Sequence, residues 1–290
     1  MIHGSPAPIF LCGATASGKS AYAIQLAHEL NGEIVNGDAF QLYRGLEVLS
    51  AAPSAEERAT VPHQLYGVLS PETKYDAQAY AQLALPAIAE IQTRGKVPIV
   101  TGGSGLYLKF LTHGASPLPP GDPALRAELD TRPLEDLVAQ LQSLDPLEAS
   151  RTHLKNRRYV SRALEICLLT GRPVSALRDQ WETAAKNRES SLRGFVIERT
   201  RSDLHARIAR RTAAMLAGGA IEEVEKLSAT ASTTCFKAIG FQQISALLDG
   251  EIDLPRCTEL INAATRQYAK RQETWFRREK WLKPISVSAT

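Results

Sequence analysis

The sequence has few of the residues that cross-link a chain or anchor it in a membrane. Its four cysteines, Cys12, Cys167, Cys235 and Cys257, are widely scattered and form no C-x-x-C pair. This spacing argues against a structural zinc site and a disulfide framework, so we expect four reduced thiols. No apolar run approaches the roughly 20 residues of a membrane span, and MIHGSPAPIFLCG lacks the pattern of a signal peptide. We therefore expect a cytoplasmic protein with no membrane partner.

Net charge is also small. Lysine and arginine exceed aspartate and glutamate by only three, so a polyanionic partner would have to be bound by local clusters of basic residues. The chain has 290 residues, of which 44% are hydrophobic and 22% are charged. Such a composition is typical of a globular protein, and this length favours two structural units.

The segment GATASGKS matches the phosphate-binding pattern G-x-x-x-x-G-K-[ST]. Glycines there let the backbone curve around an anion, Lys19 supplies a charge, and the Ser20 hydroxyl suits Mg²⁺. An apolar run, PIFLC, precedes the segment and a helical pattern, AYAIQLAHEL, follows it, which favours a true phosphate loop. The predicted phosphate-binding residues are Gly13, Ala14, Thr15, Ala16, Ser17, Gly18, Lys19 and Ser20. The motif leaves open whether the phosphate belongs to a nucleotide.

The order of elements predicts an α/β fold, with a parallel phosphate-loop sheet flanked by helices. Strand EIVNGD ends in Asp38, a helix ends at Gly95, and strand KVPIVTGGSG opens into a glycine cluster. Because the carboxyl ends of parallel strands meet at one edge, the three loops should converge there.

A change in composition predicts an inserted, mostly helical subdomain. Five prolines fall within residues 113–133, a helical and charged stretch follows, and GFVIERT reads as a strand that returns to the sheet. We assign residues 1–112 and 195–290 to the core with C-terminal helices, and 113–194 to the insertion.

Two basic segments have helical spacing. Arg151, Lys155, Arg158 and Arg162 should share one helix face, as should Arg266, Lys270, Arg277 and Lys280, with Tyr268 and Trp275 on the opposite side of the second helix. Basic faces are often only solvated, but two of them beside a phosphate loop favour a nucleic-acid backbone.

The chain resembles the tRNA dimethylallyltransferases, also called tRNA isopentenyltransferases or the IPP transferase family. The segments that carry the resemblance run over nearly the whole chain: GATASGKS, GDAFQLYRGL, VPHQLYGVLSP, VTGGSGLYLKFL, SRALEICLLTGRP, FKAIGFQQI and TRQYAKRQETWFR. The resemblance implies that the phosphate loop binds dimethylallyl diphosphate and that the acceptor is N6 of adenosine 37, in the tRNA anticodon stem-loop.

The resemblance also implies residue roles. Asp38, Lys19 and Arg211 are the expected catalytic residues, and Ser20 the expected ligand of Mg²⁺. Expected tRNA contacts are Asp38, Ala39, Phe40, Gln41, Ser104, Arg126, Arg158, Arg162, Lys237, Gly240, Lys270, Arg271 and Arg277. We expect a monomer, although no residue pattern decides oligomeric state.

Asp38 suits the chemistry of such a reaction. An exocyclic adenine amine is a weak nucleophile, so a carboxylate that takes its proton would accelerate transfer by about 10²–10⁴-fold. Asp38 has two alternative roles: it could hold magnesium through water, or it could cap a turn.

The sequence departs from the family pattern at several positions. The family usually has serine at Ala39, the stretch Gly-Thr-Ala-Lys-Pro at Leu49–Pro53, threonine at Ser104 and arginine at Tyr159. The lysine missing at Ala52 removes a cation. Three alternatives therefore remain: a small-molecule kinase with a phosphate loop, a catalytically impaired paralogue that only binds tRNA, and a transferase that acts on free AMP.

Overall fold

The computed structural model describes residues 6–114, 116–189 and 192–286, and the chain divides into two compact units. Unit 1 comprises Met1–Leu111 with Ser191–Thr290, and unit 2 comprises Thr112–Ser190. The sequence analysis placed these divisions at 113 and 194. The second differs because strand β5 already begins at Arg193. The outer limits of the expected core, residues 1 and 290, lie outside the described residues.

Unit 1 is built on a six-stranded sheet in the order β3-β2-β4-β1-β5-β6, and every neighbouring pair is parallel. The α/β fold with a parallel sheet is confirmed. The strands are β1 Ile9–Gly13, β2 Gly32–Asn36, β3 His63–Gln64, β4 Val97–Gly102, β5 Arg193–Glu198 and β6 Leu282–Ser286. Strand β1 is buried along its whole length between β4 and β5, as its continuous apolar sequence predicts. Two strands were not predicted. Strand β3 has only two residues, and most residues of β6 are polar or exposed.

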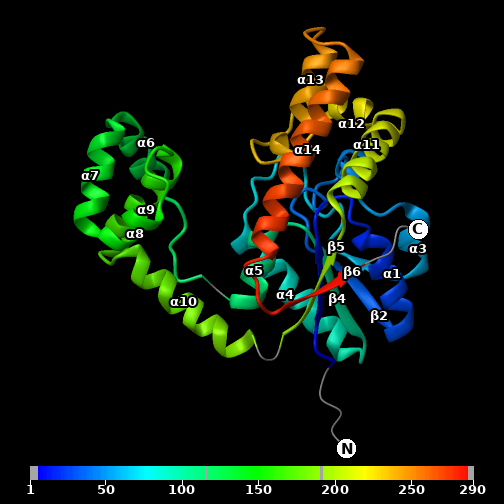
Figure 1. Ribbon diagram of the computed structural model, residues 1–290, viewed down its shortest axis with the longest axis horizontal. Coiled ribbons are helices and arrows are strands. Elements are labelled where there is room, and N and C mark those ends of the chain that lie inside the picture. The colour runs from blue at the N-terminus through cyan, green and yellow to red at the C-terminus, as the bar shows by residue number, and fades with distance from the viewer. Residues whose placement is uncertain (1–5, 115, 190–191, 287–290) are drawn as a thin grey trace, which may run out of the picture. The chain divides into compact units, whose positions relative to one another are not determined.

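The helices of unit 1 lie on both faces of the sheet and beyond one end of it (Figure 1). Those that precede the insertion are α1 Lys19–Leu30, α2 Glu47–Ser50, α3 Ala55–Thr60, α4 Ala77–Thr93 and α5 Gly105–His113. Those that follow it are α11 Arg201–Ala217, α12 Ala220–Leu227, the short 3₁₀ helix Cys235–Lys237, α13 Phe241–Leu248 and α14 Leu254–Phe276. Helix α4 ends before Gly95, whose φ of +71° matches the predicted glycine stop.

The carboxyl ends of β1, β2 and β4 meet at one edge of the sheet. Cys12 is in register with Gly102, and Asn36 is in register with Thr101. The chain segments that leave these strands therefore start side by side. A Cβ on Gly102 would overlap with the backbone of Gly37, so the approach of the two loops requires glycine at 102.

Helices α11 to α14 gather at this same edge (Figure 1). Helix α14 packs against α11, α13 and β1. A separate apolar cluster holds α11, α12, α13 and α14 to the segment around α2; its larger members include Leu46, Leu49, Met215, Phe241 and Ile261. The C-terminal helices thus form a second wall opposite the strand ends.

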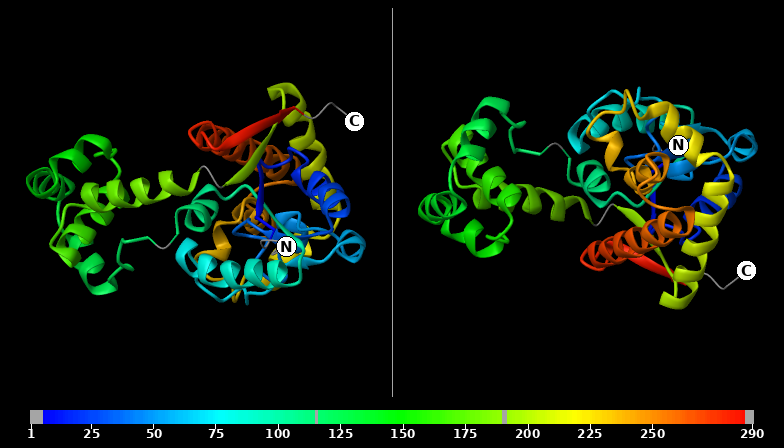
Figure 2. Two further views of the ribbon diagram at one scale, coloured as in Figure 1. Left: turned by 90° about the horizontal axis from the view of Figure 1, so that it is seen from below. Right: turned by 90° about the horizontal axis from the view of Figure 1, so that it is seen from above.

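Unit 2 is entirely helical in its described part, with helices that pack around one another (Figure 2). They are α6 Pro123–Thr131, α7 Leu134–Leu144, α8 Pro146–Arg151, α9 Arg157–Thr170 and α10 Val174–Glu189. Their core includes Leu129, Leu137, Leu141, Val160 and Leu164. The helices of this unit begin within the proline-rich stretch of residues 113–133, whose second half contains α6. There Asp122 caps α6 and Pro123 occupies its first turn, a position where proline starts a helix rather than preventing one.

All four cysteines are buried, and none is bonded to another. Among the described residues, no helix combines the length and apolar character needed to cross a bilayer.

Candidate active site

The phosphate loop joins β1 to α1 in a tightly wound turn. Gly18 has a φ of +90° and Ala16, although not glycine, has a φ of +62°. A Cβ on Gly13 would lie 2.6 Å from the Ser17 hydroxyl oxygen, so a side chain at that position would displace this hydroxyl. A non-glycine residue in the left-handed region is uncommon, and the cost of this conformation is tolerated at ligand-binding sites. The loop ends at the N-terminus of α1, where backbone N–H groups and the helix dipole favour an anion.

Three side chains from the C-terminal half of the chain hold this loop. Nη1 of Arg211 donates to the Thr15 hydroxyl at 2.8 Å, and Oε1 of Gln272 accepts from the Thr15 N–H at 2.8 Å. Nε of Arg199 donates to the Ser17 carbonyl at 2.6 Å. Of these side chains, the sequence analysis found only Arg211. Gln272 lies between predicted contact residues, but its bonds reach 257 residues back along the chain.

Asp38 lies just past β2, on a turn held by the fully buried Asn36. The Asn36 side chain accepts the N–H of Asp38 at 2.8 Å and donates to the Asp38 carbonyl at 3.1 Å. The Asp38 carboxylate accepts the Phe40 N–H at 3.1 Å, and the hydroxyl of Ser104 accepts the Ala39 N–H at 3.0 Å. The expected site residues Asp38 and Ser104 are thus adjacent. Asn36 is the residue of this turn that the sequence analysis missed.

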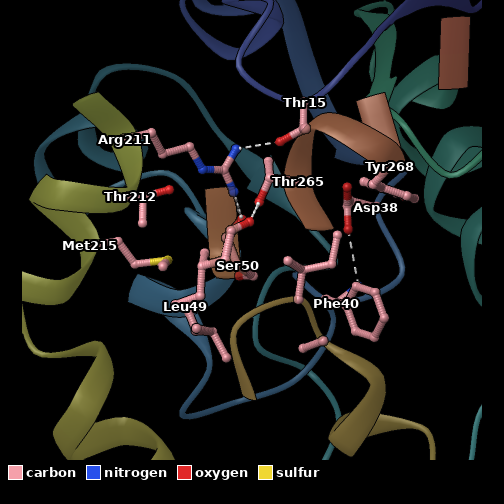
Figure 3. A pocket seen from close by; sticks show the side chains of 13 residues that line it. Thr15, Asp38, Phe40, Leu49, Ser50, Arg211, Thr212, Met215, Thr265 and Tyr268 are labelled. Atoms are coloured by element: carbon pink, nitrogen blue, oxygen red, sulfur yellow. Dashed lines mark hydrogen bonds between the residues drawn. The ribbon is translucent and has the colours of Figure 1, made fainter. Parts of the chain in front are cut away.

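A pocket lies between Asp38 and the phosphate loop residue Thr15. In Figure 3, Asp38 and Tyr268 stand on one side of the pocket, and Arg211 with Thr15 stands on another. The lining residues are Thr15, Asp38, Phe40, Leu49, Ser50, Arg211, Thr212, Met215, Ala238, Ile239, Ile261, Thr265 and Tyr268. About half of these side chains are apolar, so the pocket can hold a hydrocarbon group or a base between a carboxylate and a guanidinium.

A second hollow lies on the other side of Arg211 and is strongly cationic. It is lined by Ala16, Gly18, Lys19, Ser20, Gln41, Ala51, Arg207, Arg210 and Arg211. None of these lining residues is acidic, although Asp203 lies 3.4 Å from Nε of Arg207. Arg211 lines both spaces. A diphosphate in the cationic hollow could therefore extend an attached apolar group into the neighbouring pocket.

Burial and neighbouring charges set the protonation of this site. Burial lowers the pKa of Lys19 to about 8, with Asp38 opposing the change and Arg211 adding to it. Burial likewise lowers the pKa of Arg211, again opposed by Asp38; a guanidinium nevertheless stays charged near neutral pH. Burial, followed by the charge of Asp38, raises the pKa of Tyr268, so its hydroxyl stays neutral and can donate a hydrogen bond.

The residues present fit a magnesium ion only together with a bound phosphate. Among the described residues there is no cluster of three or more His, Cys, Asp or Glu side chains that could hold a metal. Two residues nevertheless offer oxygen atoms to a metal ion: Ser20, which lines the cationic hollow, and Asp38, which lines the pocket. Mg²⁺ commonly combines one or two protein oxygens with phosphate oxygens and water. The site thus suits an ion that arrives with its diphosphate.

The other expected contacts of unit 1 lie around these spaces. Nε2 of Gln41 donates to the carbonyls of Ser50 and Ala51 at 3.2 and 2.9 Å. Gly240 has a φ of +102° and begins α13, and Lys237 is exposed one turn earlier.

The second basic stripe is only partly as predicted. Arg266 and Lys270 lie on α14 and line one groove with Arg277, which caps the helix. Lys280 lies beyond the helix end, so its predicted place on the same face was wrong. The groove also contains Arg201 and His205 of α11, which the sequence analysis missed. Arg271 is exposed, with its guanidinium 5.7 Å from the centre of the Tyr268 ring.

The first basic stripe does not form. The chain turns between α8 and α9, so Arg151 and Arg158 lie on different helices and Lys155 lies in the turn. Helical periodicity cannot reveal such a break, because a short turn between two helices keeps the pattern nearly in phase. Arg151 pairs instead with Asp179 at 3.1 Å.

Arg126 and Arg162, both expected tRNA contacts, share one buried partner in unit 2. Glu165 is fully buried and lies 3.0 Å from Nε of Arg126 and 2.5 Å from Nη1 of Arg162. Arg158 and Tyr159 are exposed on the same helix, α9. The two pairs leave a net positive charge around Glu165, because one carboxylate serves two guanidinium groups.

The sequence and fold were compared with known proteins. Residues 41–279 match the family model described as IPP transferase. The chain belongs to the IPP transferase family. A tRNA dimethylallyltransferase of Akkermansia muciniphila is 45% identical over 280 residues, which cover 97% of this chain and 93% of that protein. One of Geobacter metallireducens is 42% identical and covers 93% of this chain and 89% of its own length.

Solved structures of the family have the same fold. The tRNA isopentenylpyrophosphate transferase of Bacillus halodurans is 32% identical, with a TM-score of 0.70, and covers 97% of this chain and 89% of its own. A eukaryotic dimethylallyltransferase acting on tRNA has a TM-score of 0.82 at 26% identity, covering 97% of this chain and 74% of its own. The resemblance stated from the sequence is confirmed.

The lowered pKa of Lys19 predicts how anion binding depends on pH. The protonated amine binds the anion, so the affinity for inorganic pyrophosphate should fall above about pH 8, where the free protein loses this proton, by up to tenfold per pH unit. Calorimetric titrations from pH 6.5 to 9.5 measure this. Lys19→Arg is the matched control because arginine stays protonated over this range and the ligand titrates identically. The same decline in both proteins would rule out Lys19 as the cause.

Proposed function

We propose that this chain transfers the dimethylallyl group of dimethylallyl diphosphate to N6 of adenosine 37 in tRNA. The observation that supports this most directly is the pocket in which Asp38 faces Arg211 and the phosphate loop (Figure 3). A proton acceptor and an anion-binding group lie there on different sides of a pocket whose lining is about half apolar. Both bacterial relatives are named tRNA dimethylallyltransferase.

In the proposed reaction, N6 of the adenine attacks C1 of the allylic donor. The C1–O bond breaks and its electron pair leaves with the diphosphate, while the N6 proton passes to the carboxylate of Asp38. Lys19 and Arg211 stabilise the charge that develops on the leaving group. A magnesium ion held by Ser20 and the diphosphate would add further positive charge there. The apolar side chains of the lining disfavour water near the allyl group, where it would compete with the amine.

The acceptor base would enter the pocket unstacked. An adenine in a stacked loop hides its amine, and extruding it costs a few kcal/mol. Phe40 and Tyr268 give the pocket aromatic walls against which a base can stack. The groove of Arg266, Lys270 and Arg277 and the exposed Arg158 are suited to RNA phosphates. We propose that the enzyme is a monomer, and that the reaction is cytoplasmic since the substrate is tRNA.

The missing lysine at position 52 does not leave the anion site poor in charge. Ala51, next to it, lines the cationic hollow together with Arg207 and Arg210 of α11. Arginines from a neighbouring helix can supply the cation that the loop lacks. This favours a working enzyme over an impaired tRNA-binding paralogue.

Mass spectrometry of the acceptor tests the function. The protein is incubated with dimethylallyl diphosphate, magnesium and a tRNA whose adenosine 37 is unmodified. The mass of that nucleoside should rise by one C₅H₈ unit. Parallel reactions contain free AMP or labelled ATP. Modification of AMP but not of tRNA would indicate a transferase that acts on free AMP. Transfer of labelled phosphate to a small molecule would indicate a kinase, and tRNA binding without modification would indicate an impaired paralogue.

Asp38→Asn distinguishes a general base from a metal ligand. The amide keeps the size of the side chain but cannot accept the proton, so the single-turnover rate should fall by about 100-fold or more with tRNA affinity nearly unchanged. The rate is measured across a magnesium titration, with the exposed Asp130→Asn as matched control. Recovery of the rate at high magnesium would assign Asp38 to the metal instead.

Arg158→Ala tests the RNA contact of unit 2. Loss of one phosphate contact should lower tRNA affinity and reduce the slope of log affinity against log salt by about one unit. Filter binding at several salt concentrations measures the slope. Arg172→Ala, which removes an exposed arginine that bonds to Gln180 in the same unit, is the control. Equal slopes for Arg158→Ala and the unchanged protein would show that Arg158 does not contact RNA.

A further inference from the structure

Gln272 is a buried amide at the centre of the candidate site. It lies on α14, is only 5% exposed, and makes two hydrogen bonds of 2.8 Å. Oε1 accepts from the N–H of Thr15, and Nε2 donates to the carbonyl of Gly103. These partners fix the orientation of the amide, because an N–H requires an acceptor and a carbonyl requires a donor.

The two bonds connect the loops that carry the opposite ends of the reaction. Thr15 belongs to the phosphate loop, while Gly103 precedes Ser104, whose hydroxyl accepts the N–H of Ala39. Ala39 directly follows Asp38. One carboxamide and one hydroxyl therefore link the anion-binding loop to the turn of the proton acceptor.

The loop after β4 is shaped to receive this side of α14. A Cβ on Gly103 would overlap with Nε2 of Gln272, and a Cβ on Gly105 would overlap with the ring of Trp275. Gln272 and Trp275 are three residues apart and so lie on one face of the helix. Both glycines therefore allow the loop to approach the side chains of that face closely.

We propose that Gln272 is a positioning residue that sets the distance between the phosphate loop and the Asp38 turn. The inference rests on the proposed function, in which C1 of the donor and N6 of the acceptor must meet between these two loops. A displacement of about 1 Å between reacting groups can reduce a rate by about 100-fold. Gln272 does not itself line the pocket or the cationic hollow, so it acts through its hydrogen-bond partners Thr15, which lines the pocket, and Gly103.

Two variants separate positioning from a merely structural role. Gln272→Met keeps the length of the side chain and removes both hydrogen bonds, so the single-turnover rate at saturating substrates should fall about 10–100-fold. The KM values for tRNA and donor should change less than about threefold. Gln272→Glu keeps an acceptor for the Thr15 N–H but directs a carboxylate at the Gly103 carbonyl and adds negative charge beside the anion-binding loop. It should lose rate and also raise the donor KM about tenfold or more.

The control is Gln82→Met, which makes the same change at an exposed site on α4. All rates are normalised to the fraction of protein that binds pyrophosphate. The proposal would be overturned if Gln272→Met had the same normalised rate as the unchanged protein. It would also be overturned if the Met and Glu variants had equal KM values for the donor. An unchanged protein that transfers no dimethylallyl group to tRNA would overturn the proposed function and this inference together, whereas activity that is insensitive to Gln272 overturns this inference alone.

Discussion

The arrangement of the active site depends on how Thr15 is held. An anion-binding loop has to direct several N–H groups at its ligand, so those groups cannot also stabilise the loop. In this protein side chains from outside the loop supply part of the stabilisation, with Arg211 on the Thr15 hydroxyl and Gln272 on the Thr15 N–H. The same two side chains belong to α11 and α14. The C-terminal helices therefore form one wall of the pocket and also determine the shape of the phosphate loop.

The site holds its opposite charges on different sides of a pocket whose lining is about half apolar. Asp38 lies on one side of the pocket, and Arg211 on another, with Leu49, Met215 and Ile261 among the residues of the lining. In such a medium charges interact more strongly than in water, so the same groups that attract a diphosphate also affect one another. The lowered pKa of Lys19 reflects this, since burial disfavours its charge while Asp38 favours it. A bound diphosphate would strengthen the charged form.

In unit 2, by contrast, opposite charges are in direct contact, with two arginines around a single buried glutamate. Glu165 alone would be costly to bury, and the guanidinium groups of Arg126 and Arg162 compensate for it. These pairs restrict two long side chains that would otherwise be free in solvent. Because both arginines remain partly exposed, they can still meet a phosphate, but with a geometry that Glu165 has already set.

Local sequence was sufficient to predict the strands β1, β2 and β4, the phosphate loop and the position of Asp38 at the end of a strand. Each of these is determined within a few residues by apolar runs and glycines. Family resemblance added Arg211 and Ser104, which no local pattern indicates. Only the tertiary structure revealed Gln272, Asn36 and the cationic hollow with Arg207 and Arg210, and only it showed that a turn separates Arg151 from Arg158. These features depend on contacts between residues far apart in the chain or on a break that helical periodicity does not record. A sequence pattern determines which face of an element is apolar, whereas the partner of a buried polar group is decided by which elements pack together.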